Sequence, residues 1–152
     1  MTSRLVMTRA KNIPDVRFAK VRVDHSTETA EDYVEGISDL IHRQGQCRVK
    51  DMVKQMGVSH VTVVRTIARL AKEGLATSEP YRPIRLTAKG ERLAARSRHR
   101  HEIVLSFLLA LGVRPVDAAR DAEGIEHHVS PDTLKRMKAF VVKHTRQSGV
   151  SH

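Results

Sequence analysis

Residues 48–70 constrain the fold of this chain most, because two apolar patterns of helical spacing meet there at a glycine. The first pattern comprises Val49, Met52, Val53 and Met56. Gly57 follows it, and glycine often ends a helix because it adopts positive φ at no steric cost. Ser59 then supplies a hydroxyl that can cap the first turn of a second helix. The sequence therefore predicts a helix, a tight turn and a second helix that ends at Leu70.

The second helix of this pair has an apolar side and a polar side that lies nearly opposite. The apolar side comprises Val63, Val64, Ile67, Leu70 and Ala71, and the polar side comprises Thr62, Arg65, Thr66 and Arg69. In the major groove of DNA, arginine pairs with guanine, and threonine contacts phosphate or the methyl group of thymine. The alternative is a helix face that is simply solvated. We favour DNA binding, to which Ser59 and His60 at the start of the helix also contribute.

The charge of the whole chain agrees with a nucleic-acid partner. Its 152 residues include 27 Lys and Arg against 17 Asp and Glu, and this formal net charge of +10 favours nucleic acid ahead of a membrane surface. The single cysteine, Cys47, excludes an intramolecular disulfide and indicates a reducing compartment. The sequence shows no signal peptide and no run of about 18 apolar residues. We therefore expect a cytoplasmic protein with no membrane partner.

The segment after the second helix has the pattern of a wing. Two runs with strand character, residues 75–78 and 84–87, flank a proline-rich turn over residues 79–83. A short hairpin directly after a DNA-reading helix is typical of a winged helix-turn-helix. Arg82 would lie at the tip of this wing, beside Tyr81 and Arg85, where basic side chains contact the DNA backbone.

A further helix is predicted before this unit. Its core stripe comprises Tyr33, Ile37, Leu40 and Ile41. The stripe predicts that the folded part opens near Thr29 and that the helix ends at Gly45. Residues 1–27 show no sustained periodicity and are rich in Lys and Arg, so we expect a basic arm without fixed structure. That arm is either a solvated tail or an additional contact to phosphates or a minor groove.

Three helices are predicted after the wing. Thr87 caps a long helix that runs to about Leu111, and a second helix begins at Pro115. Ser130 and Pro131 begin the last one, whose stripe would pack or dimerise. That stripe comprises Leu134, Met137, Phe140 and Val141. We expect residues 147–152 to be frayed.

Residues 120–128 contain the chemically most informative cluster. If they are helical, steps of 100° place Glu123, Glu126 and His127 in one sector, while His128 turns away. Carboxylates with one imidazole suit manganese, iron or zinc better than a thiophilic ion. Three ligands do not complete a six-coordinate site, but other helices offer more candidates. These candidates are Asp32, Glu35 and His101.

Each additional candidate also has a purely structural interpretation. Asp32 and Glu35 lie in what is predicted to be a first helical turn, where acids favour the helix dipole. His101 faces inward from an apolar stripe, and an inward histidine is more often a hydrogen-bonded core residue than a ligand. The later carboxylate cluster favours the metal-binding interpretation for all three.

The chain resembles a known family in several motifs that occur in order behind the winged helix. These are Glu31-Asp32-Tyr33-Val34-Glu35, Arg100-His101-Glu102 and Glu123-Gly124-Ile125-Glu126-His127-His128. Residues from about 29 to 146 are similar to the manganese branch of the diphtheria-toxin-repressor-like metalloregulators. The resemblance implies a homodimer in which a DNA-binding domain precedes a helical metal-binding and dimerisation domain. It also implies a ligand set of Asp32, Glu35, His101, Glu123, Glu126 and His127.

Two of these positions favour manganese. In iron-responsive relatives, the counterparts of Asp32 and Glu126 are typically Met and Cys, whereas both are carboxylates here. Carboxylate oxygens suit manganese better than sulfur does. One departure from the family lies in the wing, where members often carry Arg-Gly and this chain has Arg82-Pro83.

We therefore expect a mainly α protein with a winged helix-turn-helix DNA-binding domain over residues 28–88 and a helical metal-binding and dimerisation domain over residues 89–146. Its expected role is repression: as a homodimer it would bind double-stranded operator DNA when Mn(II) occupies the carboxylate and histidine site, and so control manganese uptake genes. The alternative within the family is a response to Fe(II), and other divalent ions can be expected to bind in vitro.

Two alternative functions outside the family have less support. A metal-dependent hydrolase of the His-Glu-x-x-His type would need histidine at position 105, where the chain has leucine, and no nucleophile and base pair stands out. The other alternative is a winged-helix regulator that responds to a small organic ligand, in which the acidic residues have only a structural role. We expect neither enzymatic activity nor a small organic substrate.

Overall fold

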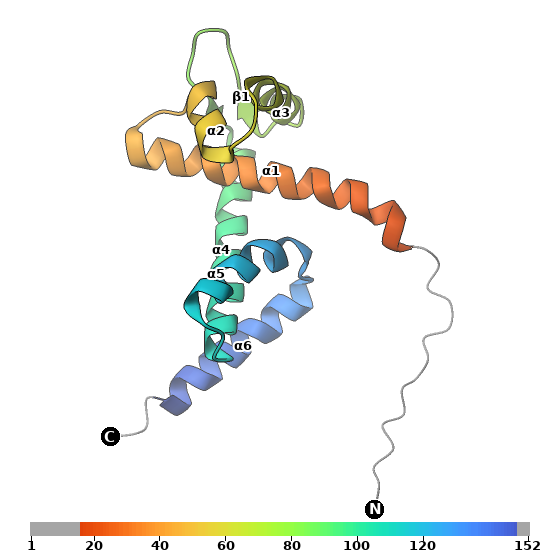
Figure 1. Ribbon diagram of the computed structural model, residues 1–152, viewed down its shortest axis with the longest axis vertical. Coiled ribbons are helices and arrows are strands. Elements are labelled where there is room, and N and C mark those ends of the chain that lie inside the picture. The colour runs from red at the N-terminus through yellow and green to blue at the C-terminus, as the bar shows by residue number, and fades with distance from the viewer. Residues whose placement is uncertain (1–15, 149–152) are drawn as a thin grey trace, which may run out of the picture.

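The computed structural model describes residues 16–148 and is mainly helical there, as predicted. The elements in chain order are α1 (Val16–Gln44), α2 (Val49–Met56), α3 (His60–Lys72), β1 (Ala76–Thr77), β2 (Arg85–Leu86), α4 (Ala88–Ala110), α5 (Pro115–Ile125), the 3-10 helix η1 (Glu126–His128) and α6 (Pro131–Ser148). Figure 1 shows α1 crossing the upper end of α4, with α2, α3 and the wing above α1 and with α5 and α6 beside the lower part of α4. None of the helices over residues 16–148 is long and apolar enough to cross a membrane.

Helix α1 begins much earlier than predicted. It starts at Val16 and not near Thr29, so the expectation of an arm without fixed structure is wrong for residues 16–27. Residues 1–15 lie outside the described part of the chain. The stretch from Val16 to Thr29 contains neither Gly nor Pro, so a helix nucleated on the packed part of α1 extends toward the N-terminus at little cost per residue.

The helix-turn-helix is formed as predicted. Gly57 has φ of 65° and donates its N–H to the carbonyl of Val53, while the Ser59 hydroxyl accepts a 3.2 Å hydrogen bond from the Thr62 N–H. The buried face of α3 comprises Val63, Ile67 and Leu70. Val64, predicted on the apolar side, is instead 45% exposed. It lies about 100° from Val63 around the helix, beyond the edge of the stripe that faces the core.

The wing is a two-stranded antiparallel hairpin, in which Ala76 pairs with Leu86 and Thr77 with Arg85. At its tip the Arg82 N–H donates to the carbonyl of Glu79. Tyr81 has φ of 64° and is fully exposed. A bridge from Cys47 to Ile84 ties the hairpin base to the segment after α1. The hairpin therefore projects from the core with its basic tip free of packing.

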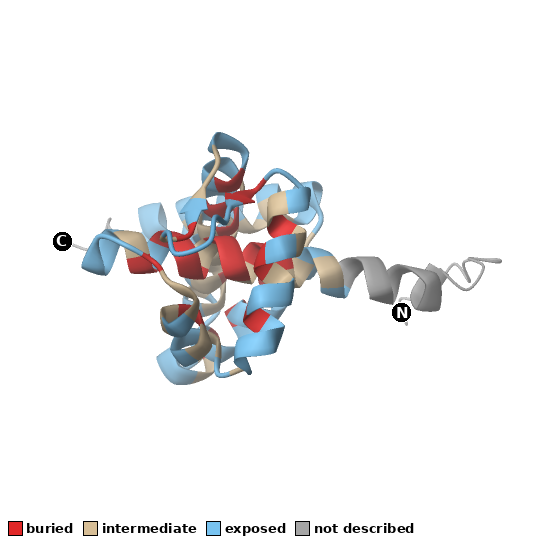
Figure 2. Ribbon diagram, turned by 90° about the horizontal axis from the view of Figure 1, so that it is seen from above, coloured by how far each residue is buried: buried red, intermediate tan, exposed pale blue. Residues whose placement is uncertain are grey.

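Two close contacts fix the course of α4. Its Gly90 passes so near the backbone of Leu75 that a Cβ there would lie 2.0 Å from the Leu75 carbonyl oxygen, so only glycine fits. At the other end, Phe107 packs edge-on against Phe140 of α6, with ring centroids 5.4 Å apart. The contact at Gly90 places the start of α4 against the base of the wing, and the contact at Phe107 holds α6 against α4. In Figure 2 the buried segments gather where the helices cross, and the outer faces are exposed.

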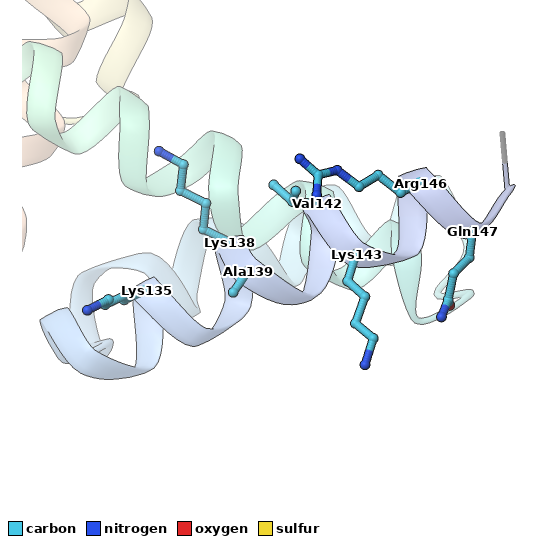
Figure 3. A pocket seen from close by; sticks show the side chains of 7 residues that line it. All are labelled: Lys135, Lys138, Ala139, Val142, Lys143, Arg146 and Gln147. Carbon is cyan, nitrogen blue, oxygen red and sulfur yellow. The ribbon is translucent and has the colours of Figure 1, made fainter. Parts of the chain in front are cut away.

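The last helix includes the start of the segment expected to be frayed. Helix α6 continues to Ser148 and so contains Gln147 and Ser148, while residues 149–152 lie outside the described part. The outer face of α6 bears an open groove (Figure 3). Its lining comprises Lys135, Lys138, Ala139, Val142, Lys143, Arg146 and Gln147. This lining offers cationic groups and no carboxylate or imidazole, so it does not suit a metal ion.

Candidate metal centre and DNA-binding surface

The carboxylates and histidines predicted as ligands converge where α1, α4 and η1 meet. Two groups of side chains there have ligand atoms that all lie within 4.8 Å of one another. One group comprises His101, Glu123 and Glu126, and the other comprises Glu28, Asp32 and His127. The two groups thus contain five of the six predicted ligands, together with Glu28, which was not predicted.

The first group lies between α4 and the end of α5. The Nδ1 atom of His101 contacts the carboxylate of Glu126 closely and lies 3.6 Å from Oε1 of Glu123. Glu126 is almost fully buried, whereas Glu123 is exposed. Burial raises the pKa of Glu126 to about 7, against the opposing effect of His101. A carboxylate held in such a desolvated place gains more than an exposed one from a nearby positive charge.

The second group joins α1 to η1. The side chain of His127 is 2% exposed and has carboxylates on both ring nitrogens: Nε2 lies 3.1 Å from Asp32 Oδ1, and Nδ1 lies 2.6 Å from Glu31 Oε2. The hydrogen bond with Asp32, and then that with Glu31, raise the pKa of His127 to about 10. His127 therefore connects the C-terminal half of the chain to α1.

The change of helix type at Glu126 explains why His127 and Glu126 belong to different groups. The sequence argument assumed an α-helix through His128, which would keep both side chains in one sector. The α-helix instead ends at Ile125, and the tighter 3-10 turn rotates each residue by about 120°. This turn directs one carboxylate oxygen of Glu126 toward His101 and the His127 ring toward α1, while the other Glu126 oxygen stays 3.5 Å from Nε2 of His127.

Glu35 is near the centre but in neither group. It is half-buried, and burial raises its pKa against the opposing effect of the nearby Ser97 hydroxyl. Its Oε1 atom is inaccessible to solvent and has no hydrogen-bond partner among the described residues. A buried acceptor without a partner costs on the order of 1–3 kcal/mol, and a cation would remove that cost. This orphaned oxygen, beside two groups of oxygen and nitrogen donors, fits a centre for divalent cations.

Sequence reasoning did not assign roles to two residues that support the centre. Glu31 is buried and accepts hydrogen bonds from His127 and from Nη1 of Arg100, the latter at 3.2 Å. Arg100 also donates to the carbonyl oxygen of Glu126 at 2.6 Å. Such partners orient ligands and fix the histidine tautomer. The sequence did hold one indication of their roles, because Glu31 and Arg100 directly precede the predicted ligands Asp32 and His101.

The predicted DNA-binding residues of α3 differ in how free their side chains are. His60 and Arg65 are exposed, and no ion pair or hydrogen bond of their side chains is found in the described part of the chain. The hydroxyls of Thr62 and Thr66 are engaged locally, the first with Ser59 at 2.8 Å and the second with the carbonyl of Thr62 at 2.8 Å. Arg65 therefore offers DNA a guanidinium that no other residue in 16–148 engages.

Two other predicted arginines contact protein groups. Arg69 donates from Nη2 to the carbonyl of Ser26 at 3.4 Å and lies 3.8 Å from Glu73, so it holds α3 against α1. Arg82 at the wing tip lies 3.2 Å from Glu79 and is otherwise exposed. Sequence reasoning also missed Val61, which is 62% exposed on α3. The face offered by α3 is therefore less charged than predicted.

Comparison with known proteins identifies the class. Residues 25–84 match the family model of the iron-dependent repressor N-terminal DNA-binding domain, and residues 87–148 match that of the iron-dependent repressor metal-binding and dimerisation domain. The chain belongs to this family of transcriptional regulators.

Within the family, the chain is similar to regulators called MntR. It is 52% identical to the transcriptional regulator MntR of Escherichia coli O157:H7 over 127 residues, which cover 84% of this chain and 82% of that protein. It is 37% identical to the HTH-type transcriptional regulator MntR of Geobacillus kaustophilus over 115 residues, or 76% of this chain and 82% of that protein. The resemblance inferred from the sequence motifs is thereby confirmed.

Solved structures give the same result. A manganese-dependent transcriptional repressor in complex with manganese matches with a TM-score of 0.67 and 30% identity over 74% of this chain and 52% of that one. The manganese regulator SloR matches with a TM-score of 0.66 and 28% identity over 74% of this chain and 53% of that one. This chain thus spans about half the length of these two structural neighbours.

Proposed function

We propose that this chain is a manganese-responsive repressor that binds operator DNA as a homodimer when Mn(II) occupies the centre between α1, α4 and η1, and that it controls manganese uptake genes. The observation that carries the proposal is the connection of Asp32 on α1 with His127 on η1. Helix α1 also packs against the helix-turn-helix, so a centre that includes Asp32 connects the DNA-binding part to the C-terminal part.

The residues present suit this role. Mn(II) bound there supplies a double positive charge that the carboxylates of both halves can share. Without it, the carboxylates on α1 and those on α5 and η1 repel one another across the same space. Holding the two halves in one arrangement requires a coupling of only about 1 to 3 kcal/mol to change operator affinity by about 5- to 150-fold.

The donor set favours manganese over iron. Asp32 and Glu126 offer oxygen where a softer site would offer sulfur, and the solved relative with 30% identity carries manganese. Fe(II) remains the alternative ion, since imidazole and carboxylate also suit it. Because its partner is operator DNA, the protein would act in the cytoplasm.

The exposed apolar side chains suggest where a second copy binds. Leu109 and Leu111 at the end of α4, and Val116 at the start of α5, are between 42% and 72% exposed. Exposed apolar side chains on consecutive segments favour burial against a matching surface, and two copies related by a twofold axis bring identical surfaces together. The dimer would present two α3 helices to successive major grooves.

A titration tests this function. The purified protein would be mixed with DNA duplexes selected from a random library. Binding would be measured by fluorescence anisotropy in the presence of Mn(II), Fe(II) or Zn(II) and in the absence of metal. We expect operator affinity to rise at least about fivefold with Mn(II). Operator binding that does not depend on any metal would contradict the proposal and favour a regulator that responds to an organic ligand. Hydrolysis of the duplex would instead favour an enzyme.

A further inference from the structure

Glu28 lies at the metal centre, although none of the sequence motifs points to it. It precedes Asp32 by four residues on α1, so the two side chains lie on the same face one turn apart. A carboxylate oxygen of Glu28 lies within 4.8 Å of the ligand atoms of Asp32 and His127. The Glu28 side chain is 28% exposed, less than that of Asp32 at 42%.

The orientation of His127 leaves one nitrogen for an ion on this side. Its Nδ1 is held by Glu31, which is itself held by Arg100. A histidine that binds a metal typically has its other ring nitrogen bonded to a carboxylate in this way. The remaining nitrogen, Nε2, points toward Asp32. Oε1 of Glu126 also lies 3.5 Å from this nitrogen, and Glu28 adds a further carboxylate within reach of Asp32 and His127.

Two histidine rings lie beside the Glu28 carboxylate. Its Oε2 lies 3.6 Å from Nε2 of His128 on η1 and 3.7 Å from Nδ1 of His25, one turn earlier on α1. Histidines from both helices that the centre joins therefore flank the carboxylate. His128, which the sequence argument set aside because it turns away from Glu123 and Glu126, thus contacts the same centre through Glu28.

We propose that Glu28 is a metal ligand that, with Asp32 and His127, binds one divalent ion beside a second ion bound by His101, Glu123 and Glu126. His128 and His25 are positioning residues for the Glu28 carboxylate. The inference rests on the proposed function, because it takes Mn(II) as the ion. The competing interpretation is that Glu28 makes only exposed ion pairs with the two histidines, and such pairs contribute little.

The test counts bound ions in the full-length protein. Free Mn(II) would be measured by electron paramagnetic resonance during titration of the parent, Glu28→Gln and Glu102→Gln. Glu102 is a matched control, since it is an exposed glutamate on α4 that lies outside both groups. We expect two ions per chain in the parent and in Glu102→Gln. In Glu28→Gln we expect one ion to bind as in the parent and the other to bind at least about tenfold more weakly.

The possible outcomes separate the inference from the proposed function. Two ions bound by Glu28→Gln with parental affinities would overturn the inference and leave the function intact. A parent that binds no Mn(II) would contradict the function itself. Circular dichroism of the metal-free proteins checks that each variant is folded. Should Glu28→Gln fail to fold, Glu28→Asp serves instead, and there we expect a smaller loss of affinity for the same ion, because its shorter side chain keeps the charge.

The positioning role of His128 has its own readout. In His128→Ala, we expect weaker binding of the ion at Glu28 but unchanged nitrogen couplings in the electron spin echo spectrum of bound Mn(II), since only His101 and His127 would supply nitrogen ligands. Loss of a nitrogen coupling would show that His128 is itself a ligand and would overturn this assignment. Parental affinity in His128→Ala would overturn it as well.

Discussion

The two groups of the metal centre differ in what they connect. The group of His101, Glu123 and Glu126 lies within the C-terminal half, on α4, α5 and η1. The group of Asp32, His127 and Glu28 spans α1 and η1, and α1 is the helix that packs against the helix-turn-helix. An ion in the first group would stabilise one half of the molecule, whereas an ion in the second would couple the two halves. The second group is therefore the better candidate for the switch.

The largest effect is expected from removing the α1 side of the second group. In Asp32→Ala, saturating Mn(II) should no longer raise operator affinity, a loss of about 5- to 150-fold, because α1 is no longer coupled to η1. His101→Ala should keep part of the response, since it leaves the second group intact. Anisotropy with operator duplex at fixed Mn(II) measures both. An equal loss in the two variants would remove the distinction between the groups.

Exchanging the donor atom at the same position sharpens the comparison. In Asp32→Met, a neutral thioether replaces a charged oxygen, so the response to Mn(II) should weaken more than the response to Fe(II) or Co(II). The metal concentration that gives half-maximal operator binding measures this for each ion under anaerobic conditions. If the ratio between manganese and iron stays at its parental value, Asp32 does not set the metal preference.

The DNA-binding surface should respond independently of the centre. Arg65→Ala should lower operator affinity by about 1 to 3 kcal/mol at saturating Mn(II), because the Arg65 guanidinium is exposed on α3 and engages no other group within residues 16–148. Mn(II) binding itself should be unchanged. Arg69→Ala is the matched control: its guanidinium is engaged with Ser26 and Glu73, so a smaller loss of operator affinity is expected. A larger loss in Arg69→Ala than in Arg65→Ala would reverse these roles.

The smallest effect is expected from the N-terminal residues. Residues 1–15 carry Arg4, Arg9 and Lys11. If these cations bind phosphates, deleting residues 2–15 should reduce the slope of log affinity against log salt by about 0.9 for each phosphate that is no longer neutralised, without changing the Mn(II) response. Operator binding measured between low and moderate salt checks this. An unaltered slope would mean that these residues do not bind DNA.

Local patterns predicted the DNA-binding part well. The turn at Gly57, the cap at Ser59 and the hairpin after α3 each depend on a few neighbouring residues, and all three are present. Val64 was placed on the apolar side of α3 from its helical angle, but that angle does not show how far the core reaches around the helix, and Val64 is exposed. The early start of α1 was not predicted, because a helix can extend beyond its packed part without the apolar stripe on which the prediction relied.

The sequence by itself determined which residue types the metal centre has, because carboxylates and histidines at helical spacing already specify hard donors for a divalent ion. Only the tertiary structure decided how they are divided. The 3-10 turn at Glu126, the crossing of α1 over α4 and the bond from Arg100 to Glu31 direct each side chain to one group or the other. The contacts of Glu31 show the range involved: Arg100 is 69 positions away in the sequence and His127 is 96 positions away. The relative placement of such residues follows from packing of the whole core and not from any local pattern.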